Sequence, residues 1–86
     1  MPRISEFFGI SIYLYYADHA PPHFHAFYQG QEGVFSIQTL ALVTGQMSPR
    51  VRALIVEWAA QHQADLMHSW MQAQTGQPPD RIAPLE

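Results

Sequence analysis

The sequence contains no cysteine and no lysine in 86 residues. Without cysteine the chain has no disulfide, no thiolate nucleophile and no thiolate metal ligand, so histidine and carboxylate side chains remain as candidate ligands. Without lysine the positive charge rests on four arginines, and the formal net charge is −3. Affinity for nucleic acids comes largely from neutralising phosphates, and these arginines form no stripe along the sequence. Direct binding of DNA or RNA is therefore disfavoured.

Long apolar runs are also missing. No stretch approaches the roughly 18 consecutive apolar residues of a membrane span, and the first residues do not form an apolar segment of the signal-peptide kind. We therefore expect no membrane association and a cytoplasmic location. The length is that of a single domain, over residues 1–86, with one modest hydrophobic core.

Alternation of apolar and polar residues predicts β-strands in the first half of the chain. Residues 9–16 alternate strictly, residues 23–29 are extended and aromatic, and residues 33–38 resume the alternation. A glycine-containing turn joins the second and third segments, as in a β-hairpin. A short further strand can form over residues 42–44. The predicted sheet is antiparallel and has three or four strands.

The second half of the chain predicts one long helix. Ser48 is a good N-cap residue, and Pro49 suits the first helical position. Neither proline nor glycine follows until Gly76, so the helix is expected over about residues 49–74, with a proline-rich tail over residues 77–86. The predicted fold class is α+β, with the helix packed on one face of the sheet.

Two apolar strips run along this predicted helix. One strip includes Trp58 and His62 and is expected to face the sheet, with His62 buried and hydrogen-bonded to a strand carbonyl. The second strip lies well round the helix, and the tail covers it or it contacts another chain, since large exposed apolar patches are uncommon on monomers. The candidate interface residues on the second strip are Val56, Ala60, Met67 and Met71.

Histidines and a carboxylate are concentrated between residues 18 and 25. His23 and His25 are two positions apart on a predicted strand, so both side chains leave the same face. Two imidazoles in this arrangement can share one metal ion, with Asp18 or His19 as a third ligand. Nitrogen and oxygen ligands of this kind favour Zn, Mn, Fe or Ni over Ca.

The same histidines also fit a structural role, stacked and hydrogen-bonded among the aromatic side chains of an open sheet face. Catalysis is a further alternative, because a carboxylate can orient an imidazole as a general base. However, the sequence has no nucleophile elbow, no phosphate-binding glycine loop and no His-Glu-x-x-His motif, which disfavours an enzyme. The candidate functional cluster is Asp18, His19, His23, His25, Tyr13 and Tyr15.

Four segments carry a family resemblance: Pro2-x-Ile4-Ser5-x-Phe7-x-Gly9-Ile10, Ile12-Tyr13-x-Tyr15-Tyr16-x-Asp18-His19-x-Pro21-Pro22-His23-Phe24-His25-Ala26, Tyr28-x-Gly30 and Glu57-Trp58. Over nearly its whole length the chain resembles a family of small bacterial proteins classed as a domain of unknown function and marked by the motif Asp-His-x-Pro-Pro-His-Phe-His-Ala. The resemblance implies a partner encoded nearby and a role in transcriptional regulation or a toxin–antitoxin system. Unlike the family pattern, the predicted helix start has only Arg50 and Arg52 as basic residues, which further disfavours direct nucleic-acid binding.

Two main hypotheses follow for function. The first is a non-enzymatic binding module, or a homo-oligomer, whose aromatic and histidine face or methionine-containing strip docks a protein partner in a two-gene or toxin–antitoxin-like system. The second is a metal-dependent enzyme or sensor that uses His23 and His25 with Asp18 or His19. A third hypothesis is regulation of transcription in a complex whose partner supplies the basic surface.

Overall fold

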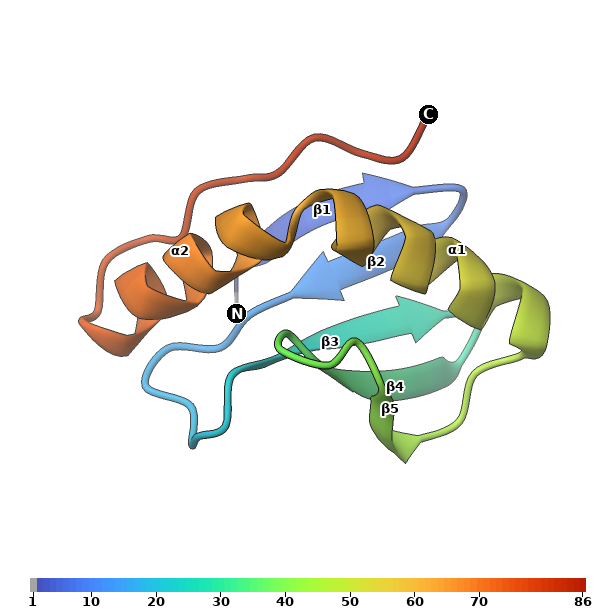
Figure 1. The fold of residues 1–86 in the computed structure, drawn as a ribbon, viewed down its shortest axis with the longest axis horizontal. Helices are drawn as coiled ribbons and strands as arrows, with labels where there is room; N and C mark the ends of the chain where they lie inside the picture. Colours follow the sequence, from blue (N-terminus) through green and yellow to red (C-terminus); the bar gives the residue numbers. More distant parts are fainter. Residues whose placement is uncertain (1) are drawn as a thin grey trace.

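The computed structural model describes residues 2–86, which form one antiparallel sheet and two helices (Figure 1). Each strand pairs with its neighbour in sequence, in the order β1-β2-β3-β4-β5. This arrangement confirms the predicted α+β class. The elements are β1 (Arg3–Phe7), β2 (Ile10–Tyr13), β3 (His23–Tyr28), β4 (Gln31–Ser36), β5 (Leu42–Gly45), α1 (Pro49–Gln61) and α2 (Gln63–Gln74).

The expectation of three or four strands is wrong by at least one, because β1 precedes the first predicted strand. The turn between β1 and β2 is Phe8–Gly9, with positive φ values of 50° and 79°. Such two-residue turns usually begin with Asn, Asp or Gly, so phenylalanine gives no turn signal. A bulge also shifts the register between Arg3 and Ser5, which breaks the alternation that marks a strand.

The expectation of one long helix over residues 49–74 is also wrong, because the helix breaks at His62. The backbone of His62 has φ −127° and ψ 25°, outside the helical region. Neither glycine nor proline marks the break. A tertiary contact lies there instead: Gln63 Nε2 donates to the carbonyl oxygens of Ile37 and Gln38 at 2.9 and 3.1 Å. The break lets α2 follow a direction of its own across the sheet.

The hydrophobic core lies between the sheet and the two helices. Phe24 and Phe35 stack with their ring centroids 5.4 Å apart, and Trp58 of α1 meets Phe24 edge-on at 5.8 Å. All three rings are fully buried. Burial of a side chain of this size stabilises the fold by about 2–3 kcal/mol. The core therefore occupies one face of the sheet.

The tail over residues 77–86 packs beside β1. Its amide of Ile82 donates to the Ile4 carbonyl oxygen at 2.7 Å, and Trp58 Nε1 donates to the Ala83 carbonyl oxygen at 2.8 Å. Ile82 and Leu85 are both buried. The tail is thus part of the core on the β1 side.

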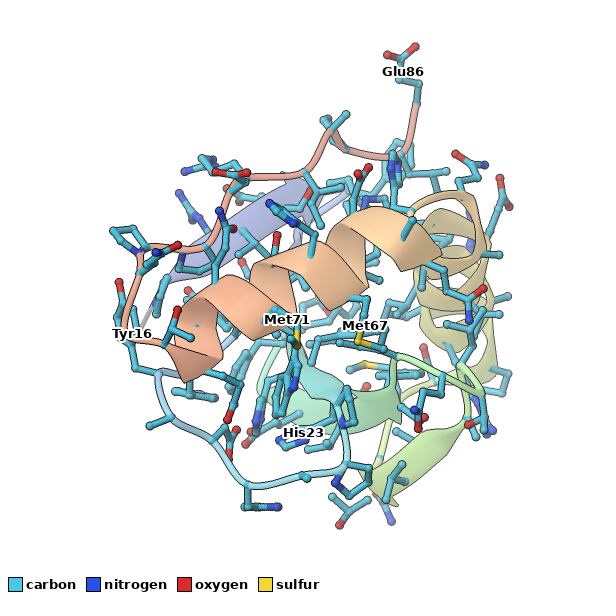
Figure 2. All side chains as sticks on the ribbon, turned by 60° about the vertical axis from the view of Figure 1, so that its left-hand side comes forward. Tyr16, His23, Met67, Met71 and Glu86 are labelled. Atoms are coloured by element: carbon cyan, nitrogen blue, oxygen red, sulfur yellow. The ribbon has the colours of Figure 1, made fainter. Side chains whose placement is uncertain are left out.

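The second helix strip is not covered by the tail. Met71 is 60% exposed and Ala60 is exposed, whereas Val56 and Met67 are half-buried against the rim of the core. Figure 2 shows Met67 and Met71 along α2. None of the helices formed by residues 2–86 has the length and apolar character needed to cross a bilayer.

Candidate functional site

The central strand β3 sets the direction of the two histidines. Phe24 faces the helices and is fully buried. His23 and His25 alternate with it, so their imidazoles leave the opposite face of the sheet. In the register of the sheet, His25 lies between Tyr13 on β2 and Val34 on β4. The pleat of β3 therefore presents both imidazoles on the face opposite the buried Phe24, where Trp70 of α2 reaches His23.

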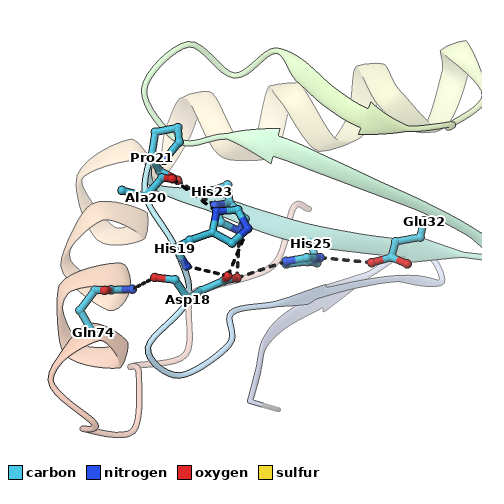
Figure 3. Close-up of polar contacts among 8 residues, drawn as sticks. All are labelled: Asp18, His19, Ala20, Pro21, His23, His25, Glu32 and Gln74. Atoms are coloured by element: carbon cyan, nitrogen blue, oxygen red, sulfur yellow. Dashed lines mark hydrogen bonds and ion pairs between the residues drawn. The ribbon is translucent and has the colours of Figure 1, made fainter.

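Asp18 comes from the loop between β2 and β3, and α2 holds this loop in place. The Ala17 amide donates to the Ala73 carbonyl oxygen at 3.1 Å, and Gln74 Nε2 donates to the Asp18 carbonyl oxygen at 2.9 Å. The His19 amide donates to Asp18 Oδ1 at 2.8 Å, which fixes one end of the carboxylate. The other oxygen, Oδ2, is left to face β3 (Figure 3).

Three ligand atoms converge at this point. Asp18 Oδ2 lies 2.9 Å from His23 Nε2 and 3.5 Å from His25 Nε2, and the ligand atoms of the three residues all lie within 4.8 Å of one another. Two ligand atoms that each lie about 2.1 Å from the same ion are about 3.0 Å apart when the ligand–ion–ligand angle is a right angle, and about 3.4 Å apart when it is tetrahedral. Both distances from Asp18 are close to this range.

The outward nitrogen of each imidazole has an acceptor. His23 Nδ1 donates to the Pro21 carbonyl oxygen at 2.7 Å, and His25 Nδ1 donates to Glu32 Oε2 at 3.2 Å. Because a carbonyl or an ionised carboxylate only accepts, this network assigns a proton to Nδ1 of both rings. His23 Nε2 lies at hydrogen-bond distance from Asp18 Oδ2, 2.9 Å, and donates to it when the ring carries a second proton. Without that proton the Nε2 lone pair faces the carboxylate and is available to a metal ion. Metal-ligating histidines have this arrangement, with the second nitrogen bonded to a carbonyl or carboxylate.

The inward nitrogen of His25 is buried and has no hydrogen-bond partner among residues 2–86. A buried polar atom without a partner costs about 1–3 kcal/mol. In rings without a second proton, two Nε2 lone pairs would also face this carboxylate oxygen and repel it. A proton on His25 Nε2 removes the first penalty, and a metal ion bound by all three residues removes both.

The electrostatic environment keeps Asp18 ionised. Burial alone raises the pKa of Asp18, but the His19 amide and the neighbouring His23 and His25 imidazoles, which favour the carboxylate when they are protonated, outweigh burial, so the pKa lies below its ordinary value of 3.8. At neutral pH the group therefore offers an anionic oxygen ligand. The side chains of Asp18, His23 and His25 are only 16%, 7% and 16% exposed, so little water competes for them.

Aromatic rings confine the two imidazoles. Tyr15 meets His25 edge-on with ring centroids 4.4 Å apart, and Trp70 of α2 lies 5.1 Å from His23. Burial raises the pKa of Tyr15, and repulsion from Glu32 and other nearby groups adds to the rise, so this side chain stays a neutral phenol at neutral pH. The two rings restrict rotation of the histidines and preserve the convergent geometry.

The structure brings together Asp18, His23 and His25, the residues named as metal ligands from the sequence. His19, the alternative third ligand, lies beside the group. Its ring centroid is 5.1 Å from that of His23, its Nε2 is 3.7 Å from Asp18 Oδ1, and its side chain is 85% exposed. His19 therefore belongs to the rim of the site.

The other predicted candidates lie outside this group. Tyr13 packs edge-on against Phe27 at 5.3 Å on the same sheet face. The interface candidates are divided between the helices: Val56 and Ala60 on α1, Met67 and Met71 on α2.

His62 differs from the expectation of a histidine bonded to a strand carbonyl. Its side chain is 18% exposed, its ring centroid is 5.7 Å from that of Trp58, and its Nδ1 lies 3.5 Å from Asp65 Oδ2. The bond to a strand-end carbonyl is made by the next residue, Gln63. His62 is thus at the helix break and away from the three-residue group.

Glu32, Gln74 and Trp70 also contact the site and are not among the residues predicted from the sequence. The Gln29–Gly30 turn carries a usable signal for Glu32, because a two-residue hairpin turn fixes the register and pairs Phe27 with Glu32, on the face that His25 occupies. Gln74 and Trp70 reach the site only through the packing of α2, and no local pattern reveals that.

Comparison with known proteins identifies a family. The profile of the family described as a domain of unknown function (DUF4160) matches residues 9–71, from the start of β2 to most of α2. No curated protein and no solved structure matches the chain.

Proposed function

The chain belongs to the DUF4160 family, since the profile covers residues 9–71 of 86, and on this premise we propose that it is a metal-dependent enzyme or sensor. Its working centre is one divalent transition-metal ion, bound by Asp18, His23 and His25. The single observation that carries the proposal is the convergence of two imidazole Nε2 atoms on one carboxylate oxygen, with the Nδ1 atoms of both rings bonded outward.

The chemistry of the donor atoms narrows the choice of ion. Two imidazole nitrogens and one carboxylate oxygen suit Zn, Fe, Mn or Ni, whereas Ca prefers six to eight oxygen ligands. Three protein ligands also leave at least one coordination position for water or another small ligand. This ligand number is typical of sites that act on or sense a molecule, because purely structural zinc sites usually have four protein ligands.

Elemental analysis and native mass spectrometry of protein purified without a histidine tag or chelator test the proposal. The ligand variants are Asp18→Asn and His25→Gln, and the matched controls are Asp65→Asn and His68→Gln, both exposed on α2. We expect one ion per wild-type chain and per control chain. Loss of a residue that binds the ion directly should weaken metal binding by more than about a hundredfold, because loss of a residue that only hydrogen-bonds to a ligand already costs about 10–100-fold.

The outcomes separate a metal site from a structural ion pair. Wild-type protein that takes up none of Zn, Mn, Fe or Ni contradicts the proposal, and so does equal uptake by ligand variants and controls. Circular dichroism checks that each variant is folded. If His25→Gln unfolds, Asp18→Asn carries the test alone, because the Asp18 backbone contacts to α2 do not use its carboxylate.

A second candidate function is docking of a protein partner on the second helix strip, as in a two-gene or toxin–antitoxin-like system or in a homodimer. The observation that favours it is the 60% exposure of Met71, beside a tail that packs elsewhere. Analytical ultracentrifugation of wild-type protein and Met71→Gln tests self-association. A wild-type dimer that Met71→Gln dissociates supports a homodimer, whereas monomers in both samples contradict it.

A further inference from the structure

A pocket lies beside the candidate metal ligands on the sheet face opposite the buried Phe24. Its volume is about 330 Å³, and His23 and His25 form part of its wall. This volume is near the lower end of the range of about 300–1,000 Å³ for ligand pockets. The rest of the wall is mainly apolar and includes Pro21, Pro22, Val34 and Val43. The pocket therefore suits a small molecule with an apolar part.

The pocket wall carries few charges. Its ionisable residues are histidines, and within the described part of the chain no Lys, Arg, Asp or Glu lines it. A doubly charged group such as phosphate would lose its hydration there without a side-chain cation to pair with. The net charge of −3 over the whole chain further disfavours highly anionic ligands. A metal ion is the one strong partner that this site can offer to a polar group.

The ion and the pocket share two residues. His23 and His25 belong both to the ligand group and to the pocket wall. A molecule in the pocket would therefore contact the two imidazoles that hold the ion, whose coordination would be incomplete with three protein ligands. Val43 of β5, which is 64% exposed, gives the pocket an apolar rim.

We propose that this pocket binds a small ligand with a neutral or singly charged metal-coordinating head and a short aliphatic body. The head binds the ion held by Asp18, His23 and His25, and the body packs against Val34 and Val43. This inference rests on the proposed function and names the ligand class of the same site.

Spectroscopic titration of the Co²⁺-loaded protein tests this inference. The probes are acetohydroxamate, butyrohydroxamate and hexanohydroxamate, with inorganic phosphate as a doubly charged comparison. Binding to the ion changes the visible absorption of Co²⁺. We expect affinity to rise by about fourfold for each methylene added, as for full burial of that group, and phosphate to bind more weakly than hexanohydroxamate.

Isosteric variants locate the aliphatic body. The double variant Val34→Thr, Val43→Thr keeps the shape and strand preference of both residues and removes apolar surface from the pocket. In this double variant, we expect the increase in hydroxamate affinity to fall to less than about twofold per added methylene, while the affinity for Co²⁺ stays unchanged. Val56→Thr, on the second helix strip, is the matched control and should retain the full gain.

Each outcome has a separate meaning. Failure to bind Co²⁺ overturns the proposed function and this inference together. Binding of Co²⁺ without dependence on chain length, or tighter binding of phosphate, overturns the inference alone. Equal hydroxamate binding after removal of Co²⁺ with EDTA, measured by isothermal titration calorimetry, also contradicts it, because the ion would then not be the anchor. If the double variant unfolds, Val43→Thr alone, at the exposed rim, makes the same comparison.

Discussion

Glu32 is expected to support metal binding without touching the ion. Its Oε2 accepts a hydrogen bond from His25 Nδ1 at 3.2 Å, and the residue lies on β4 with a side chain that is 49% exposed. A carboxylate in this position fixes the orientation of the imidazole and increases the basicity of its other nitrogen. Removal of the carboxylate should therefore weaken the affinity of the site for Zn²⁺.

The geometry sets the size of this effect. Outer partners of metal-ligating histidines typically contribute 10–100-fold in affinity. The hydrogen bond of Glu32 is longer than the usual 2.7–2.9 Å of a charge-assisted hydrogen bond, and half of the Glu32 side chain is exposed to water. We therefore expect an effect at the lower end of this 10–100-fold range. We expect Glu32→Ala to weaken Zn²⁺ binding by about tenfold, or about 1.4 kcal/mol. Glu32→Gln keeps an acceptor oxygen and should cost about threefold.

Competition with a chromophoric chelator measures these affinities. Glu57→Ala, an exposed glutamate variant on α1, is the matched control and should bind Zn²⁺ as the wild type does. Wild-type affinity in Glu32→Ala, together with loss of binding in Asp18→Asn, would refute the argument that Glu32 orients His25. A larger loss in Glu32→Gln than in Glu32→Ala would also refute it.

Three further predictions concern stability, measured by urea denaturation of metal-free protein. Leu85→Ala should lower the free energy of unfolding by about 2 kcal/mol, because Leu85 is buried at the edge of the core, whereas the exposed Arg81→Ala should have little effect. Gly45→Ala should lower it by more than about 1 kcal/mol, because Gly45 has φ +87° and a methyl group there would meet the Glu32 carbonyl. The lowered pKa of Asp18 stabilises the fold fully above pH 3.8, and this contribution is lost as the pH falls through the folded-state pKa, so Asp18→Asn and wild type should converge in acid.

Specific results would contradict these three predictions. A wild-type urea midpoint for Leu85→Ala would mean that the tail does not pack as described. Full stability of Gly45→Ala would mean that β4 and β5 approach less closely than the structure shows. A constant difference between Asp18→Asn and wild type from pH 6 to pH 2.5 would mean that the Asp18 carboxylate gains nothing from its partners on folding.

Local sequence patterns predict the central strand and its two histidines but not the elements that complete the site. His23 and His25 alternate with the buried Phe24, so their shared face follows from the period of a strand. Asp18 is five residues before His23, which makes their contact accessible to sequence reasoning, although the choice between Asp18 and His19 depends on how the loop bends. In the structure α2 fixes that bend through the Gln74 side chain.

The errors in the fold prediction have a related cause. The first strand is not predicted because the turn that ends it, at Phe8–Gly9, lacks the usual turn residues. The helix break at His62 is not predicted because neither glycine nor proline lies there. Both features depend on contacts with distant parts of the chain. Gln63 bonds to the carbonyl oxygens of Ile37 and Gln38, just after β4, and the tail residue Ile82 bonds to Ile4 of the first strand. Propensity and periodicity do not include such contacts.

The most direct test of the central claim is X-ray absorption spectroscopy at the zinc edge on protein loaded with one equivalent of Zn²⁺. We expect two imidazole nitrogens and at least one carboxylate oxygen at about 2.0–2.2 Å from the ion. The imidazole signal should fall by about half in His25→Gln and stay unchanged in the His68→Gln control. A spectrum without imidazole scattering, or one that His25→Gln leaves unchanged, would contradict the assignment of Asp18, His23 and His25 as the metal centre.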